Sequence, residues 1–276
     1  MHTPARPTVP DSRLHVVAEP SRFGGSRGWP PKTAIVTGAS SGIGREAALL
    51  LAAMNCQVLL VGRNGVALDQ VAASTEGHRI AVDLSVPGSE ATVARRGEDL
   101  LGDLDLLVCA AGLGSAGPYD QLSHETLAEL VAINVLSPMA LVRSVLPAML
   151  ERGHGRILLV GSIAGALGVR GEVAYSATKA ALVGFANALR SEVSGRGVSV
   201  TLCFPGAVDT PFFNRRGAPY VRKWPRPQPA RLVAERMLFA TGRGQAEVWV
   251  PRWLSLAARV HGAAPPLYRR LASVFG

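Results

Sequence analysis

A tyrosine and a lysine stand four residues apart in the stretch YSATK, residues 175–179. On a helix, positions i and i+4 lie on the same face, so the Tyr175 phenol and the Lys179 ammonium can project toward a common point. A free tyrosine is a weak acid with a pKa of about 10, and a nearby ammonium favours the phenolate and lowers that pKa. The pair could therefore protonate the oxygen of a ketone that receives a hydride, or it could be an ordinary pair on a helix surface.

A glycine-rich segment near the start of the chain could hold phosphate groups. The segment TGASSGIG, Thr37 to Gly44, follows an apolar run and opens a helical pattern. Glycine permits a tight turn and a close approach of phosphate oxygens to backbone N–H groups, and the helix N-terminus adds partial positive charge. The alternative is an ordinary tight turn between a strand and a helix.

Two residues after later strands could select the dinucleotide. In VGRN, Gly62 stands where an acidic residue would bind ribose hydroxyls, and Arg63 follows it. An arginine there can pair with a 2′-phosphate, which favours NADP(H) over NAD(H), although it could equally be a solvated residue at a strand end. Asp83 could accept a hydrogen bond from the adenine amino group, or it could cap backbone N–H groups of a turn.

The elements that position these residues alternate along the chain. Apolar, β-branched runs such as TAIVTG, QVLLVG, RIAVDL, LDLLVCAAG, RILLVGS, SVTLCFPG and AEVWVP are separated by helical patterns. Such alternation is typical of βαβ units and a parallel sheet. We therefore predict a single α/β domain, a doubly wound Rossmann-like parallel sheet of about seven strands with helices on both faces. Ligands would bind beyond the carboxyl ends of its strands.

Length and composition fit one globular enzyme domain. The chain has 276 residues, of which 48% are hydrophobic and 18% are charged. Three widely spaced cysteines suggest no metal cluster and fit a reducing cytosol. No uninterrupted apolar run reaches the roughly 18 residues of a membrane-spanning helix, so we expect a cytoplasmic protein.

The net charge of +9 is concentrated in two segments. Residues 215–231 carry six cations and residues 252–276 carry four, with no acid in either segment, so the rest of the chain is close to neutral. We predict a flexible leader over residues 1–30, rich in proline and containing arginines, a catalytic domain over 31–251 with a substrate lid at about 208–230, and a basic amphipathic tail over 252–276.

The combined motifs resemble the short-chain dehydrogenase/reductase superfamily over about residues 32–251. They are TGxxxGxG, an Ala-Ala-Gly turn, INV, a serine, YSATK and PGAVDT, in that order. The resemblance implies a catalytic tetrad of Asn134, Ser162, Tyr175 and Lys179, with the tyrosine 13 positions after the serine. It also implies contacts with the cofactor from Gly38, Ser40, Ser41, Gly42, Ile43, Gly44, Arg63, Asp83, Leu84, Ala111, Gly112, Tyr175, Lys179, Pro205, Gly206, Val208 and Thr210.

In the roles that the resemblance implies, Ser162 orients the substrate carbonyl beside Tyr175, and Lys179 holds the nicotinamide ribose. Asn134 could expose a backbone carbonyl to a relay water. The sequence departs from the family at Cys109, where an asparagine usually begins the turn after the fourth strand. A cysteine cannot supply the hydrogen bonds of an amide, so we expect a packing change there without loss of activity.

The basic lid and the tail leave alternatives open. The lid could be solvated and mobile, or it could attract an anionic or carrier-linked substrate such as one on a phosphopantetheine arm. In the tail, Trp253, Leu256, Ala257 and Val260 recur at helical spacing. Such a stripe fits packing on the protein's own fold or on another subunit of a homodimer or homotetramer. It also fits contact with a membrane surface, which would make the cytoplasmic protein peripherally membrane-associated.

The sequence predicts an NAD(P)-dependent oxidoreductase that prefers NADP(H) and reduces a small-molecule carbonyl or oxidises a secondary alcohol, without a metal. Nucleic acid is not expected as a partner, because the redox site is complete. Two other classes of function remain as alternatives. One is a non-catalytic dinucleotide-binding or regulatory protein, and the other is a protein that acts at a membrane surface through its tail.

Overall fold

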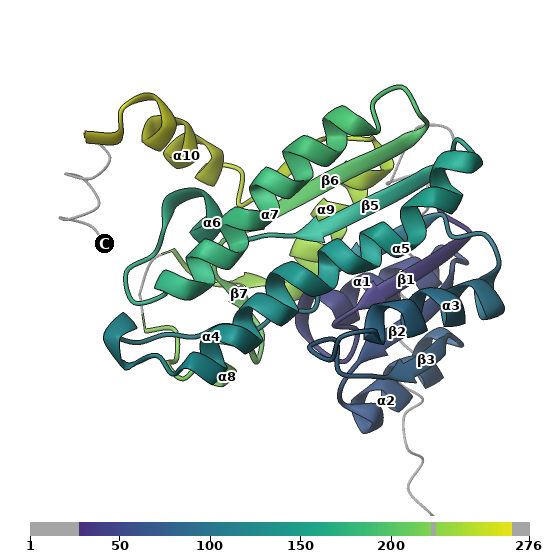
Figure 1. The fold of residues 1–276 in the computed structure, drawn as a ribbon, viewed down its shortest axis with the longest axis horizontal. Helices are drawn as coiled ribbons and strands as arrows, with labels where there is room; N and C mark the ends of the chain where they lie inside the picture. The colour runs from purple at the N-terminus through teal and green to yellow at the C-terminus, as the bar shows by residue number, and fades with distance from the viewer. Residues whose placement is uncertain (1–27, 222–224, 267–276) are drawn as a thin grey trace, which may run out of the picture.

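Seven parallel strands form the central sheet of the computed structural model, which describes residues 28–221 and 225–266 (Figure 1). The strand order is β3-β2-β1-β4-β5-β6-β9, so the chain first winds one way from β1 and then returns to β4 on its other side. This confirms the predicted doubly wound sheet. The strands are β1 (Thr33–Thr37), β2 (Gln57–Gly62), β3 (His78–Ala81), β4 (Leu106–Cys109), β5 (Gly155–Val160), β6 (Val198–Pro205) and β9 (Glu247–Val250).

The helices cover both faces of the sheet, as the sequence predicts. One face packs against α1 (Gly42–Ala53), α2 (Gly65–Thr75) and α9 (Ala230–Gly242). The other packs against α3 (Ser89–Leu101), α5 (Ser137–Glu151) and α7 (Val173–Glu192). In β1, Ala34 and Val36 face the first layer, whereas Ile35 faces the second. Because successive strand residues point to opposite faces, a strand buried on both faces is a continuous apolar run.

The long helix from His124 to Glu151 is continuous but not uniform. It consists of α4 (His124–Val131), a π-helical turn η3 (Ala132–Leu136) and α5. By length and composition it is the one helix in the described residues that could span a membrane. In this fold its residues Leu141, Val142 and Met149 are buried against the sheet. It is therefore a core helix of the α/β domain.

Several elements were not anticipated from the sequence. They are α9, the short helix α6 (Ile163–Leu167), the 3₁₀ turn η2 (Tyr119–Gln121), and the small elements of the lid. The described part of the lid contains β7 (Val208–Asp209), α8 (Phe212–Arg215) and β8 (Gln228–Pro229), and β7 pairs with β8 in a second sheet. The predicted lid residue Trp224, the leader before residue 28 and the tail after residue 266 lie outside the described residues.

The described tail forms helix α10 (Leu254–Ala263), which lies against α6 and stands apart from the sheet in Figure 1. The expected apolar stripe is only partly buried, since Trp253 is 43% and Leu256 is 64% exposed. Leu254, which the stripe left out, is the residue that packs inward, at 5% exposure. Within this chain the inward contact is therefore made by Leu254, which lies close to Gly206, and packing of the exposed stripe on another subunit or a membrane stays a prediction.

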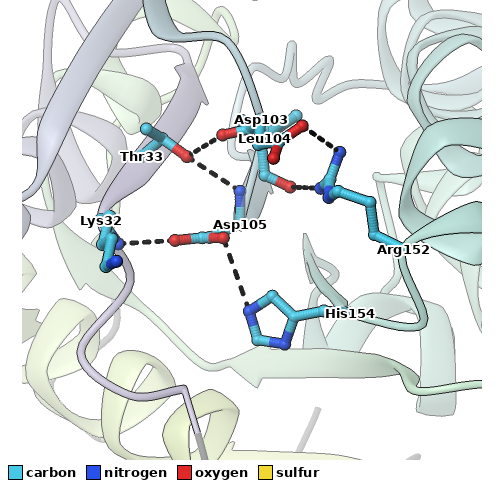
Figure 2. A network of polar contacts seen from close by, with 7 residues as sticks. All are labelled: Lys32, Thr33, Asp103, Leu104, Asp105, Arg152 and His154. Carbon is cyan, nitrogen blue, oxygen red and sulfur yellow. Dashed lines mark hydrogen bonds and ion pairs between the residues drawn. The ribbon is translucent and has the colours of Figure 1, made fainter.

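A polar network closes the amino ends of β1 and β4, at the edge opposite the strands' carboxyl ends (Figure 2). The Asp105 carboxylate accepts a hydrogen bond of 2.7 Å from the Lys32 backbone N–H and lies 3.5 Å from Nε2 of His154. The Thr33 hydroxyl accepts a hydrogen bond from the Asp105 N–H and donates to the Asp103 carbonyl. Arg152 pairs with the Asp103 carboxylate. These bonds tie neighbouring strands together where no side chain of the predicted site lies.

We predict that Asp105→Ala lowers the free energy of unfolding by about 1–3 kcal/mol, because the Lys32 N–H and His154 lose a partner whose side chain is only 17% exposed. Asp103→Ala is the matched control, since the Asp103 side chain is 77% exposed and its ion pair should contribute about 1 kcal/mol or less. Urea denaturation of both variants measures the difference. Equal losses in the two variants would contradict a structural role specific to Asp105.

Candidate active site

A cavity of about 650 Å³ opens at the carboxyl ends of the strands. Its wall contains nearly all residues that the sequence singled out for catalysis or cofactor binding. Only Asn134 and Asp83 do not line it. The lining members are Gly38, Ser40, Ser41, Gly42, Ile43, Gly44, Arg63, Leu84, Ala111, Gly112, Ser162, Tyr175, Lys179, Pro205, Gly206, Val208 and Thr210. The topology therefore brings segments that are far apart in the chain to one place.

The glycine loop fits a group that must approach the backbone closely. A Cβ on Gly44 would lie 2.5 Å from the Gly38 carbonyl oxygen, and a Cβ on Gly38 would lie 2.8 Å from backbone atoms of Ala110. Helix α1 begins directly after the loop, with no acid in its first turn and no side-chain hydrogen bond at its N-cap, Ser41. Backbone N–H groups of that turn have no partner within the helix, which suits a phosphate group.

Tyr175 lies in the cavity wall, buried at 7% exposure, and is hydrogen-bonded to the Ser162 side chain. Ser162 follows β5 and caps α6, because its hydroxyl accepts a hydrogen bond of 3.1 Å from the Ala164 N–H. Burial raises the pKa of the Tyr175 phenol above its ordinary value, and the Ser162 hydrogen bond only partly offsets this rise. The phenol is therefore protonated in the free protein and can serve as an acid.

Lys179 lies one helical turn after Tyr175, with its ammonium 5.9 Å from the centre of the tyrosine ring. The ammonium donates a hydrogen bond of 2.9 Å to the Val160 carbonyl. Burial lowers the pKa of Lys179 to about 8, so it is still mostly cationic near neutral pH. In the protein without nucleotide, desolvation of the phenolate outweighs the effects that lower the pKa of Tyr175, so the expected lowering by Lys179 stays a prediction.

Asn134 lies behind the cavity wall, inside the π-helical turn η3, and is 1% exposed. Its side-chain oxygen accepts a hydrogen bond from the Leu113 N–H, and its nitrogen donates to the Leu113 carbonyl and to the Thr178 hydroxyl. The amide thus fixes the loop after β4 against the helix that carries Tyr175. In this arrangement Asn134 positions other residues, and the backbone carbonyls that a π turn displaces lie beside it.

Comparison with known proteins agrees with this geometry. Residues 32–220 match the family model described as short chain dehydrogenase. The chain belongs to the short-chain dehydrogenase family. It is 35% identical over 243 residues to an uncharacterized oxidoreductase of Myxococcus xanthus, covering 86% of this chain and 94% of that protein. It is 33% identical over 181 residues to the 3-oxoacyl-acyl-carrier-protein reductase FabG of Escherichia coli, covering 65% of this chain and 74% of that one.

Solved structures of short-chain dehydrogenases share the fold. A short-chain dehydrogenase from Sphingobium yanoikuyae in complex with NADPH is 28% identical, with a TM-score of 0.74 over 83% of this chain and 93% of that one. A short-chain dehydrogenase from Streptomyces avermitilis is also 28% identical, with a TM-score of 0.75 over 89% of this chain and 99% of that one. This chain is thus an oxidoreductase of the family, with a dinucleotide-binding fold.

In this dehydrogenase, Arg63 does not stand free at the cavity edge. Its Nη1 atom donates a hydrogen bond of 3.2 Å to the Glu129 carboxylate and lies 3.9 Å from the Asp83 carboxylate. Asp83 accepts hydrogen bonds from the backbone N–H and the hydroxyl of Ser85, which hold the pKa of its carboxyl below the ordinary value. The contacts of Asp83 therefore match the alternative in which it caps a turn. Glu129 is a partner of Arg63 that no sequence motif indicated.

A second unexpected pair lies next to Tyr175. Glu172, at the N-cap of α7, forms an ion pair with Arg216 of the lid, and their side chains are only 14% and 10% exposed. The negative charge of Glu172 raises the pKa of Tyr175, whereas Arg216 lowers it. The pair thus balances two opposite charges beside the phenol. Glu172 stands three positions before Tyr175, and this helical spacing predicts that the two side chains lie near each other.

Cys109 stands where the resemblance leads us to expect an asparagine, and the loop that follows it has an anchor on the neighbouring strand. Cys109 is buried, and burial raises the pKa of its thiol to about 12, so it is not a reactive thiolate. The hydroxyl of Thr37, at the end of β1, accepts hydrogen bonds of 3.1 Å from the N–H groups of both Ala110 and Ala111. The loop after β4 is thus held by a threonine on the neighbouring strand.

The pKa of Lys179 predicts how stability changes with pH. Burial lowers the folded pKa from 10.5 to about 8, so between these values the unfolded chain binds more protons than the folded protein. The free energy of unfolding should therefore rise from pH 7 to pH 9 by about 1 kcal/mol more in the parent than in Lys179→Met.

Denaturation of the nucleotide-free protein at both pH values measures this difference. Lys32→Met, which removes an exposed lysine, is the matched control and should follow the parent. A Lys179→Met variant with the same pH dependence as the parent would contradict a lowered pKa for Lys179.

Proposed function

We propose that this short-chain dehydrogenase reduces a carbonyl compound with NADPH, or catalyses the reverse oxidation of a secondary alcohol, with Tyr175 as the general acid and base. The observation that carries the proposal is the buried, protonated Tyr175 phenol, hydrogen-bonded to Ser162 in the same cavity as the glycine loop. A non-catalytic nucleotide-binding role would not need an acid, a hydroxyl and an ammonium at one point of the wall.

NADPH, when bound, supplies the hydride. The residues of the chain then have to manage the negative charge that develops on the substrate oxygen. The Ser162 hydroxyl orients that oxygen beside Tyr175, and the raised pKa of Tyr175 keeps a proton available for transfer to it. After the transfer, the mostly cationic Lys179 one helical turn away favours the phenolate. Asn134 contributes by holding the loop after β4 in place.

A preference for NADPH is supported by the charges at the cavity. The wall contains one acidic side chain, Glu172, against the cationic side chains of Arg63, Arg170, Lys179, Arg215 and Arg216. Arg63 follows β2, where its guanidinium can pair with a 2′-phosphate once its ion pair with Glu129 is broken. The related Sphingobium yanoikuyae structure was solved with NADPH.

The substrate proposed is an apolar ketone. Val169, Phe212, Phe213 and Leu254 contribute apolar surface to the same cavity, near Tyr175. Two relatives are named as reductases of 3-oxo or 3-keto compounds: the Escherichia coli protein above and a 3-ketodihydrosphingosine reductase of Bos taurus. The latter is 35% identical over 216 residues, which cover 75% of this chain and 63% of that protein.

Tyr175→Phe should reduce turnover with a ketone panel by about 100-fold or more, because it removes the proton donor and leaves the ring in place. Nucleotide binding, followed by quenching of protein fluorescence, should change little. Tyr119→Phe is the matched control, since Tyr119 is 55% exposed and lies outside the cavity wall. Comparable reduction rates for Tyr175→Phe and the parent would rule out the mechanism.

Arg63→Ala should weaken NADPH binding by about tenfold and leave NADH binding nearly unchanged, because the lost contact is to the 2′-phosphate alone. Arg79→Ala is the control, as Arg79 is similarly exposed and pairs with Asp69 away from the cavity. Dissociation constants for both nucleotides are measured by titration. An unchanged ratio of the two constants would show that Arg63 is only a surface residue paired with Glu129.

A further inference from the structure

Two adjacent arginines of the lid reach to opposite sides of the cavity. The Nη2 atom of Arg215 donates a hydrogen bond of 2.8 Å to the hydroxyl of Ser41, which lies 174 positions earlier in the glycine loop. The next residue, Arg216, instead forms its ion pair with Glu172, near Tyr175. Helix α8, which ends at Arg215, therefore connects the glycine loop with the start of the catalytic helix.

The glycine loop offers Arg215 a place where an anion would also bind. Ser41 is the N-cap of α1, yet its side chain makes no capping bond, and the first turn of that helix contains no acid. The lid already lies close to this loop, because a Cβ on Gly42 would be 3.0 Å from the Thr210 methyl group. The Arg215 guanidinium thus adds a full positive charge to the partial charge of the helix N-terminus.

From this juxtaposition we infer that Arg215 binds the diphosphate of the dinucleotide, exchanging its bond with Ser41 for phosphate oxygens, and so couples cofactor binding to closure of the lid. The inference rests on the proposed function, since it names a further residue for the same cofactor. A planar guanidinium can donate two parallel hydrogen bonds to phosphate oxygens, whereas in the structure Arg215 donates one to the neutral Ser41 hydroxyl.

The positions of the other cations separate the role of Arg215 from theirs. Arg63 follows β2, on the side where a 2′-phosphate is expected, and is held there by Glu129. Arg216 faces the reacting end, where Glu172 neutralises it. Arg215 alone of the lid arginines that line the cavity makes its contact with the glycine loop. Each cation therefore matches a different part of the bound molecules.

Contacts of the lid connect the position of Arg215 to the surroundings of Tyr175. The Arg216 carbonyl accepts a hydrogen bond of 3.0 Å from the Ala116 N–H in the loop after β4. Phe212, at the start of α8, lies with its ring centre 5.5 Å from that of Tyr175. When a diphosphate holds Arg215, the same short helix keeps Phe212 over the tyrosine. Cofactor binding would then order the apolar wall before the substrate enters.

The test uses three nucleotides and the full-length protein. Arg215→Met removes the charge but keeps most of the length of the side chain. It should raise the dissociation constants for NADP⁺ and adenosine 5′-diphosphate by about tenfold. Adenosine 2′-monophosphate, which has no diphosphate, should bind within about twofold of the parent. Arg215→Lys should recover part of the loss. Arg236→Met, an exposed arginine on α9, controls for the change in net charge.

Hydrogen exchange over residues 208–221 provides a second measurement. NADP⁺ should slow exchange there in the parent and in Arg236→Met, and the protection should be lost in Arg215→Met. Unchanged affinity of Arg215→Met for adenosine 5′-diphosphate would overturn the binding role, and equal weakening of all three nucleotides would reduce it to a general charge effect. Unchanged protection would overturn the coupling to the lid.

These results are separable from those for the proposed reaction. A protein that binds NADP⁺ through Arg215 but reduces no carbonyl would refute the reaction and leave this inference standing. A protein that reduces carbonyls and binds nucleotides equally well with Arg215→Met would refute this inference alone. If the parent protein binds none of the three nucleotides, both proposals fall.

Discussion

The close backbone approach between the loops after β1 and β4 is the constraint on which the site depends. Gly38 and Gly44 leave no room for a side chain, because a Cβ on either would lie within 3 Å of neighbouring backbone atoms. From these two strands the chain winds toward opposite edges of the sheet, so the connections beyond the touching loops separate and leave a cavity at the carboxyl ends. The N-terminus of α1 can then lie directly on the cavity. Every other functional group is placed relative to this point.

Burial has opposite effects on the pKa values of Tyr175 and Lys179, the two groups proposed for proton transfer. Burial disfavours both the Tyr175 phenolate and the Lys179 ammonium, and it moves their two pKa values in opposite directions. The proposed reduction requires a protonated phenol and a charged lysine that stabilises the phenolate formed from it. The structure satisfies both near neutral pH, because the pKa of Lys179 falls only to about 8. Hydrogen bonds from Asn134 and Thr37 hold the loop after β4 beside these two buried groups.

The sequence predicts the sheet, its helices and most of the cavity wall, because these depend on local pattern. Apolar β-branched runs give buried strands, and the glycine loop and YSATK have fixed positions relative to the strand ends. What it does not predict are contacts between distant segments, such as Arg63 with Glu129 or Arg216 with Glu172. Those partners depend on the geometry of the loops, which no spacing rule determines.

Two single residues show why local sequence is not enough. Asp83 had two interpretations, a hydrogen bond to adenine and the capping of a turn, and the Ser85 N–H and hydroxyl hold one of its carboxylate oxygens in the second way. For Tyr175, the sequence indicates a nearby ammonium but not the desolvation that raises the pKa of the phenol in the folded protein. In both cases only the packed environment supplies the comparison.

The distribution of the lid's positive charges shows why the net charge of +9 is a poor guide to function. Among the described lid cations, Arg215 and Arg216 turn into the cavity, whereas Arg226 is exposed and absent from its wall. Arg231, at the start of α9, pairs with Glu235. Charges exposed to water are screened within about 10 Å, so those that face outward add little to the potential inside. The field that an anionic ligand meets therefore comes mainly from the cations of the cavity wall, of which four are held by a separate contact: Arg63 by Glu129, Lys179 by Val160, Arg215 by Ser41 and Arg216 by Glu172.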